Sequence, residues 1–293
     1  MSDLEQLAIE RLKIASEMSL RNYGLPLVIT DSGGKDSSVC KELALRSGIP
    51  FEIQHNHTTA DAPETVRFVR SEARRFEELG IKYTINMPTY KGKRVSMWSL
   101  IPKYMYPPTR KVRYCCRDLK EKGGAGRFIC TGVRWEESKS RKEKRGIYEK
   151  LGSNEIILNN DNDEKRMLFE NCRLKAKRIV NPIVDWADSD VWDFLNSDTA
   201  HPVNPLYAEG WCRVGCIGCP LAKKKARQAE FARWPRYKQL YINAFDRMME
   251  VRSTKGKNRW IGWNGVDVFN WWMENDILPG QVDLFEEDVQ WQI

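Results

Sequence analysis

The sequence predicts an α/β protein with a doubly wound, mainly parallel sheet that helices cover on both faces, followed by a C-terminal helical and Trp-rich extension. Short β-branched runs alternate with segments of helical periodicity, a glycine-containing loop joins the first such pair, and the alternation ends near Tyr207. Strands and helices at this spacing need right-handed crossovers, which favour a parallel sheet. Open sheets of this class bind ligands beyond the carboxyl ends of their strands.

The expected elements follow one another along the chain. Expected strands are the short apolar runs 27–30, 49–53, 81–86, 128–133 and 179–184. Expected helices cover 2–23, 39–47, 63–80, 188–192 and a long stretch around 227–251. Residues 135–178 are polar and charged, which predicts an excursion or mobile loop. We therefore expect an α/β domain over 1–222, which includes the cysteine loops, and a basic helical, Trp-rich extension over 223–293.

Length and composition exclude several classes of protein. The 293 residues are 41% hydrophobic and 30% charged, which is typical of a globular chain that buries a full core. Because no window approaches the roughly 18 apolar residues of a membrane span and the N-terminus lacks a signal-peptide core, we expect a cytoplasmic protein without membrane contact. Eight cysteines are too sparse for a disulfide scaffold, so their grouping points to metal or redox chemistry.

The positive charge is concentrated in residues 223–259. This segment holds 12 Lys and Arg against three acids, a local +9, whereas the whole chain carries +8. A solvated helical face is the commonest origin of such a run. The aromatic residues among these cations also suit phosphate backbones and stacked bases, so nucleic-acid contact is a hypothesis for this segment; they are Trp234, Tyr237, Tyr241 and Trp260.

The loop Ser32–Ser37 has the composition of a phosphate site. It follows a strand and opens a helix, where unpaired N–H groups and the helix dipole bind anions. Gly33 and Gly34 permit close backbone approach, Lys35 supplies positive charge and Asp36 can hold Mg²⁺. The spacing is not that of a Walker loop. A simple glycine turn capped by serine is the alternative.

Five cysteines fall into two groups that can bind metal. Cys216 and Cys219 form a C-x-x-C turn, and a complete site needs about four sulfur ligands, which Cys115 and Cys116 can complete. Adjacent cysteines strain most ligand geometries, so one of that pair together with Cys212 is an alternative set. Four thiolates also suit structural zinc, and metal-free cysteines are a third interpretation.

The cysteines outside these two groups and the three histidines give little indication of a functional site. Cys40 and Cys130 lie in apolar segments and are explained as small buried hydrophobes. His55, His57 and His201 are too few and too scattered to predict a histidine metal site or a catalytic dyad. Among them, His57 is a candidate for lining a pocket.

An ordered set of motifs resembles a known family. The hexapeptide Ser32–Ser37 resembles the SGGxDS loop of ATP pyrophosphatases and adenine-nucleotide α-hydrolases. Residues 61–65 are similar to the D-x-P-E-T segment of the phosphoadenylyl-sulfate (PAPS) reductase family, and residues 132–141 to its G-x-R-x-x-E-S-x-x-R segment. Further matching stretches, at 182–192 and 204–207, continue in the family's order, so the resemblance covers roughly residues 25–222.

The resemblance implies a set of site residues. Nucleotide phosphates would bind at Ser32, Gly33, Gly34, Lys35, Asp36 and Ser37, and the rest of the nucleotide near His57, Asp61 and Gly132. Lys35, Asp36, Arg134 and Arg141 are the implied catalytic residues, the two arginines facing the reacting anion. The alternative places both arginines on a solvent-facing charged helix. The cysteine spacing is similar to the [4Fe–4S] pattern of adenylyl-sulfate (APS) reductases, which implies the ligands Cys115, Cys116, Cys216 and Cys219, with Cys212 as substitute.

Two departures from the reductases bear on the reaction. No cysteine follows Cys219, where those enzymes carry their nucleophile, and the loop keeps the SGGKDS form of relatives that split ATP, among them DNA-phosphorothioation proteins. We therefore expect an ATP pyrophosphatase, with Mg²⁺ and an iron–sulfur cluster, that supports sulfur transfer to DNA, tRNA or another acceptor, with a sulfur donor or thiol reductant as partner. The alternatives are a PAPS or APS reductase that releases sulfite, and a non-catalytic nucleotide- or nucleic-acid-binding module with zinc.

Overall fold

The computed structural model of the chain describes residues 3–120, 126–151, 155–161, 177–197, 201–256 and 260–274. The chain forms two compact units. Unit 1 comprises residues 1–57, 61–88 and 120–215, and unit 2 comprises residues 58–60, 89–119 and 216–293. This division differs from the expected boundary after residue 222, because the segment 89–119 joins the C-terminal part of the chain through the packing of α4 (Met97–Tyr104) on α9 (Pro235–Thr254).

Unit 1 is built on a seven-stranded sheet in the order β3-β2-β1-β6-β9-β7-β8. Its strands are β1 Leu27–Asp31, β2 Phe51–Asn56, β3 Tyr83–Asn86, β6 Phe128–Cys130, β7 Tyr148–Lys150, β8 Ile156–Leu158 and β9 Arg178–Val180. The pairs β1–β2, β2–β3, β1–β6 and β6–β9 are parallel, whereas β7 is antiparallel to both β8 and β9. The predicted α/β class with a mainly parallel sheet is confirmed.

The excursion expected over residues 135–178 is partly wrong. Within its described part, β7 and β8 extend the sheet, and α5 (Lys139–Lys144) precedes them. All three residues of β7 are buried, including the charged Glu149 and Lys150. Glu149 is buried because Arg145, the Gly146 N–H and Asn181 all donate hydrogen bonds to it.

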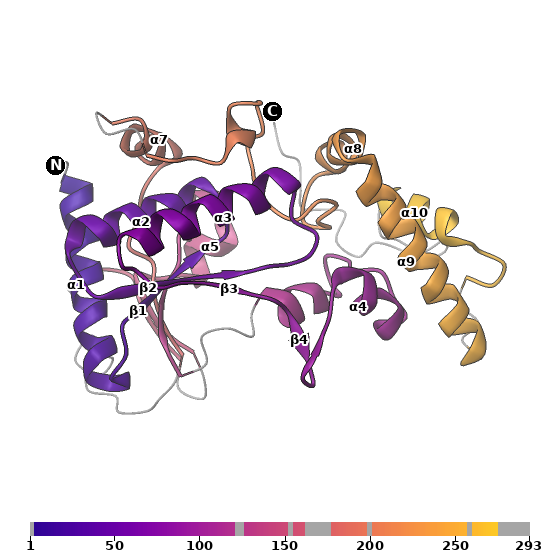
Figure 1. Ribbon diagram of the computed structural model, residues 1–293, viewed down its shortest axis with the longest axis horizontal. Coiled ribbons are helices and arrows are strands. Elements are labelled where there is room, and N and C mark those ends of the chain that lie inside the picture. The colour runs from indigo at the N-terminus through magenta and orange to yellow at the C-terminus, as the bar shows by residue number, and fades with distance from the viewer. Residues whose placement is uncertain are drawn as a thin grey trace. The chain divides into compact units, whose positions relative to one another are not determined.

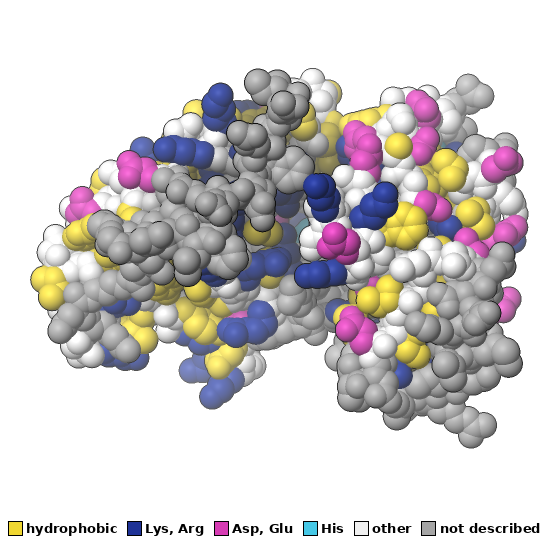
Figure 2. All heavy atoms as spheres, turned by 180° about the vertical axis from the view of Figure 1, so that it is seen from behind, with side chains coloured by type: hydrophobic (Ala, Val, Ile, Leu, Met, Phe, Trp, Pro, Cys, Tyr) yellow, Lys and Arg dark blue, Asp and Glu magenta, His cyan; other side chains and the backbone are white. Residues whose placement is uncertain are grey.

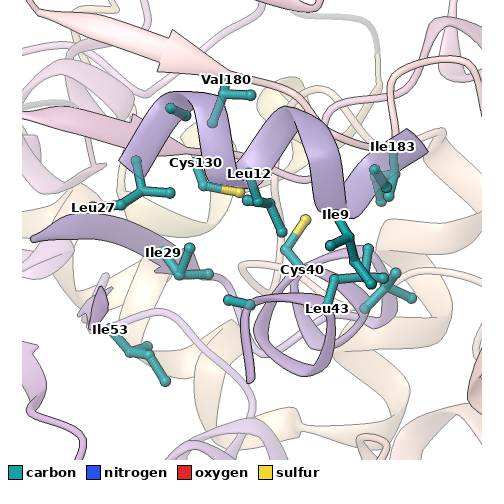
Figure 3. Close-up of a cluster of buried hydrophobic side chains, with 14 of the residues drawn as sticks. Ile9, Leu12, Leu27, Ile29, Cys40, Leu43, Ile53, Cys130, Val180 and Ile183 are labelled. Carbon is teal, nitrogen blue, oxygen red and sulfur yellow. The ribbon is translucent and has the colours of Figure 1, made fainter. Parts of the chain in front are cut away.

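The core of unit 1 lies against one face of this sheet. Alternating residues Leu27 and Ile29 of β1 join the main core cluster, whereas Val28 belongs to a smaller cluster, as the two-residue period of a strand requires. The main cluster includes side chains from α1 (Asp3–Tyr23), α2 (Lys35–Ser47), α3 (Pro63–Glu78) and α7 (Asp188–Leu195). Figure 1 shows α2 and α3 running along the strands. Cys40 and Cys130 are fully buried in this core, as predicted (Figure 3).

Unit 2 is mainly helical. A two-stranded hairpin, β4 (Thr89–Tyr90) and β5 (Lys93–Arg94), precedes α4, whose N-terminus is closed by a capping box of Ser96 and Ser99. The π-helix η1 (Cys116–Lys120) follows, and the other helices in the described part of the unit are α8 (Lys224–Arg233), α9 and α10 (Gly265–Glu274). Among the described residues, no helix has both the length and the apolar character needed to cross a bilayer.

The single long helical stretch expected around residues 227–251 is two helices. The chain leaves helical geometry at Trp234, whose φ is −125° and ψ is 70°, and Pro235 begins α9. Proline disfavours a helical conformation in the residue before it and fits the first turn of a new helix. The predicted Trp-rich tail is confirmed in α10, where Trp272 is fully buried against Tyr241 and Phe245.

Candidate functional site

The glycine loop closes tightly between β1 and α2. Gly33 has a φ of +73°, and a side-chain carbon there would lie 2.7 Å from Thr65 Cγ2. The Asn204 side chain donates hydrogen bonds to the Gly33 carbonyl at 3.0 Å and to Thr65 at 3.1 Å. Glycine is therefore required at this position for both its conformation and its close contact with α3.

A buried carboxylate beneath the loop fixes its shape. Asp31, the last residue of β1, accepts hydrogen bonds from the Gly33 N–H at 2.7 Å, Ser37 Oγ at 2.9 Å, Lys41 Nζ at 2.8 Å and Tyr83 Oη at 2.5 Å. Burial alone would raise the pKa of Asp31, but the charge and hydrogen bond of Lys41, with smaller contributions from Tyr83 and His55, outweigh it and the net pKa is lowered. Asp31 therefore stays ionised and fixes the loop through its hydrogen bonds with Gly33 and Ser37.

Two positively charged side chains bond to one carboxylate, that of Asp188 at the start of α7, beside the glycine loop. Lys35 Nζ and Arg134 Nη2 both bond to Asp188 Oδ1, the latter at 2.7 Å, and Arg134 Nε donates to Asp36 Oδ1 at 2.7 Å. Burial alone would raise the pKa of Asp188, yet the bonds from Lys35 and Arg134 lower it overall. The structure thus brings together the predicted Lys35, Asp36 and Arg134, and it adds Asp188.

Two further contacts pack the loop against its neighbours. Tyr207 Oη accepts a hydrogen bond from the Lys35 backbone N–H at 3.0 Å, and burial is the main reason that the pKa of Tyr207 rises to about 12. A side-chain carbon at Gly132 would lie 2.8 Å from the backbone carbonyl carbon of Asp36. Only glycine lets the chain after β6 pass this close to α2.

The two predicted arginines have different surroundings. The Arg134 side chain is 4% exposed, so the solvent-facing alternative does not apply to it. Arg141 lies on α5 with a 39% exposed side chain and pairs with Glu137, which also accepts a hydrogen bond from the Arg134 N–H at 3.3 Å. The described contacts therefore link Arg141 to the site through Glu137.

The histidines at the end of β2 are not scattered. The ligand atoms of His55, His57 and Asp61 all lie within 4.8 Å of one another, a group of three able to hold a metal ion. His55 and His57 were therefore wrongly described as scattered, and whether they bind a metal is taken up below. His201 lies elsewhere, where it stacks on Phe194 at 5.1 Å and pairs with Glu42.

The four cysteines predicted as cluster ligands lie in unit 2, and the pKa of Cys115 depends on the other three. A hydrogen bond with Cys116, followed by burial and electrostatic interaction with Cys116, Cys216 and Cys219, raises the pKa of Cys115. Arg113 Nη2 lies 3.5 Å from Cys116 Sγ, and Thr58 Oγ1 lies 3.3 Å from Cys216 Sγ. The substitute ligand Cys212 is exposed and belongs to unit 1.

The C-x-x-C turn packs against the aromatic side chains of Phe231, Tyr241 and Trp272. Between its cysteines, Gly218 has a φ of +71°, and a side-chain carbon there would lie 2.6 Å from Phe231 and 3.1 Å from Tyr241. Burial first, and then the electrostatic influence of the neighbouring Cys216, Cys115 and Cys219, raise the pKa of Tyr241. The turn is therefore rigid, and its cysteines are partly shielded from water.

The basic segment keeps exposed cations but not exposed aromatic rings. Trp234, Tyr241 and Trp260 are at most 8% exposed, so the idea that they stack on bases is wrong for these three; Tyr237 is half-buried. Among the described residues of the segment, eight Lys and Arg side chains are exposed: Lys223, Lys224, Lys225, Arg233, Arg236, Lys238, Arg247 and Lys255. Lys and Arg side chains are prominent over unit 2 in Figure 2 (left-hand part).

The fold and the loop define an α/β protein in which a glycine loop follows the first strand of a mainly parallel sheet. Residues 26–222 match the phosphoadenosine phosphosulfate reductase domain family, and the chain belongs to that family. The predicted resemblance is confirmed.

Individual proteins are also similar to this chain. An uncharacterized protein of Methanocaldococcus jannaschii is 30% identical over 261 residues, which cover 86% of this chain and 54% of that protein. This chain therefore spans about half the length of that relative. The adenosine 5'-phosphosulfate reductase of Allochromatium vinosum is 25% identical over 71% of this chain and 73% of its own. A PAPS reductase structure from Candida auris superposes with a TM-score of 0.48 at 16% identity, covering 74% of this chain and 96% of that one.

Proposed function

We propose that this protein is an ATP pyrophosphatase of the PAPS reductase family that adenylylates an acceptor and thereby supports sulfur transfer. The observation that carries the proposal is the convergence of Lys35 and Arg134 on Asp188 beside the glycine loop. Cations at a helix N-terminus suit the phosphates of a nucleotide. The SGGKDS form of the loop favours ATP over an adenylyl sulfate.

In the proposed reaction, an acceptor oxygen attacks the α-phosphorus of ATP and the bond to the bridging oxygen breaks, which releases pyrophosphate. Lys35 and Arg134 stabilise the charge that develops on the leaving group. Asp36, with a side chain 26% exposed, is the candidate to hold the Mg²⁺ that accompanies the nucleotide. Asp188 is a positioning residue, because the phosphates compete with it for Lys35.

We also propose that Cys115, Cys116, Cys216 and Cys219 hold a [4Fe–4S] cluster. Among the described residues, these cysteines do not form a group of three with sulfurs within 4.8 Å of one another. Four sulfurs on one zinc ion, each bonded at about 2.3 Å, would lie about 3.8 Å apart. Each cysteine of a cluster binds a different iron, so wider spacing suits a cluster better than zinc. When bound, such a cluster supplies electron transfer or an iron site for sulfur.

The activity is tested on protein purified without oxygen. We expect pyrophosphate from ATP when DNA or tRNA is present as acceptor, and no sulfite from PAPS or APS with a thioredoxin-type thiol donor. Sulfite release would instead establish the reductase alternative, which the similarity to the Allochromatium vinosum enzyme favours. Nucleotide binding without either product would leave the non-catalytic module as the better account.

Nucleic-acid binding is a separate prediction for the exposed cations of residues 223–259. The double variant Arg233→Ala with Arg236→Ala removes two exposed charges. If both contact phosphates, the slope of log affinity against log salt for DNA or tRNA falls by about 1 to 2. The matched control is Lys13→Ala with Arg21→Ala on α1, where both residues are also exposed. An unchanged slope in the first variant would make the segment an ordinary solvated surface.

A further inference from the structure

We propose that His55, His57 and Asp61 form a second metal site, which binds a divalent transition-metal ion independently of the cysteines. Their ligand atoms lie within 4.8 Å of one another at the carboxyl end of β2. His55 and Asp61 are buried, at 3% and 6% exposure, and His57 is half-buried. Binding of the ion does not depend on the ATP pyrophosphatase proposal, whereas the phosphate ligand assigned to the ion below rests on phosphate binding at the glycine loop.

The hydrogen bond of His55 prepares this side chain as a ligand. Its Nδ1 lies 2.9 Å from the backbone carbonyl oxygen of Asp31. Because a carbonyl oxygen only accepts, Nδ1 carries the proton and donates it, which leaves a lone pair on Nε2. Metal-binding histidines are characteristically held in this way, with the second nitrogen donating to a carbonyl or carboxylate.

The spacing of His57 and Asp61 also fits one ion. His57 Nδ1 lies 3.2 Å from Asp61 Oδ2. Two ligand atoms bonded to one ion at about 2.0–2.2 Å lie about 3 Å apart in octahedral geometry and slightly farther apart in tetrahedral geometry. A simple histidine–carboxylate ion pair would account for these two residues but not for the third ligand atom supplied by His55.

The donor set selects the class of metal. Two imidazole nitrogens and one carboxylate suit Zn²⁺, Fe²⁺, Ni²⁺ and Mn²⁺ better than Mg²⁺ or Ca²⁺, which prefer oxygen alone. Three protein ligands leave coordination positions open, which is the arrangement of reactive and substrate-binding sites and not of closed structural ones.

The location of the proposed ion, close to the glycine loop, indicates which ligand could fill its open coordination positions. β1 and β2 are adjacent and parallel, and Asp31 is the register partner of His55. Since Asp31 leads directly into the glycine loop, an ion held by His55 would lie at the same sheet edge as that loop. A phosphate oxygen is therefore the ligand class we assign to the open positions.

Mn²⁺ is the probe that separates this site from the cysteines, because thiolates prefer softer metals. Without nucleotide, the full-length protein is titrated with Mn²⁺, and the loss of the six-line electron paramagnetic resonance signal of free Mn²⁺ measures binding. We expect one Mn²⁺ per chain, displaced by Zn²⁺ as the Irving–Williams order requires. Spin-echo modulation from bound imidazole nitrogen should accompany it.

Matched variants decide whether these residues hold the ion. His57→Gln and Asp61→Asn should each weaken Mn²⁺ binding at least tenfold, whereas His201→Gln, which alters the remaining histidine of the chain, should not change it. Circular dichroism and melting temperature establish that each variant is folded. Binding that survives in both site variants, binding without nitrogen modulation, or no stoichiometric uptake of Mn²⁺ or Zn²⁺ would each overturn the proposal.

Discussion

Replacing Lys35 with alanine is expected to lower ATP-dependent pyrophosphate release by about 100- to 1,000-fold, the usual loss when one preorganised charge or donor is removed from a transition state. The Lys35 ammonium lies at the start of α2 and its residue is 7% exposed. Its positive charge is therefore poorly screened by water and acts strongly on a phosphate bound to the loop. The measurement is the initial rate of pyrophosphate formation at saturating ATP.

The Lys35 variant should remain folded. Asp188 keeps its bond to Arg134 at 2.7 Å, so the substitution leaves no unpaired carboxylate at this position. The variant loses the bond of the ammonium to Asp188 and its contact with the Trp192 ring, 5.3 Å from the centroid; the latter is worth about 0.5–2 kcal/mol of unfolding free energy.

Two companion variants sharpen this test. Lys35→Met keeps most of the aliphatic side chain and removes the charge, so it should be as inactive as Lys35→Ala. Lys13→Ala removes an exposed lysine from α1 and should retain the full rate. Unchanged pyrophosphate release in Lys35→Ala would exclude Lys35 from the mechanism.

The sequence predicts those parts of the fold that carry a strong local signal. β1 begins with three buried apolar residues and leads into a glycine loop, and α3 begins at Pro63, where proline suits the first helical turn. β7 has no such signal, because two of its three residues are Glu149 and Lys150. Their burial depends on partners such as Asn181 from another part of the sheet, which no local pattern reveals.

The same distinction separates the site residues that were foreseen from those that were missed. Lys35 and Asp36 stand in a contiguous motif, but Asp188 is 153 positions from Lys35 and looks like an ordinary acidic start of a helix. His55 and His57 alternate along the end of a strand, and alternate positions point to the same side. His57 and Asp61 were expected near a nucleotide, and this spacing was the available signal that they could form the proposed metal site with His55.

Substitution of the cluster ligands should have the second large effect. Protein purified without oxygen is expected to contain about four iron and four acid-labile sulfide per chain, the content of a [4Fe–4S] cluster. Cys216→Ser should reduce both to less than about one per chain. Cys216 is 8% exposed and part of a turn fixed by Gly218, so a serine oxygen there is a poor ligand for iron with little freedom to adjust.

Cys212→Ser is the matched control, because Cys212 is exposed and lies outside unit 2. It should retain full iron and sulfide if Cys115, Cys116, Cys216 and Cys219 are the ligands. Loss of the cluster in Cys212→Ser with retention in Cys115→Ser or Cys116→Ser would transfer the ligand role to Cys212. Stoichiometric zinc without sulfide in the unaltered protein would make the cysteine site structural, and the phosphate loop would then carry the chemistry without a redox centre.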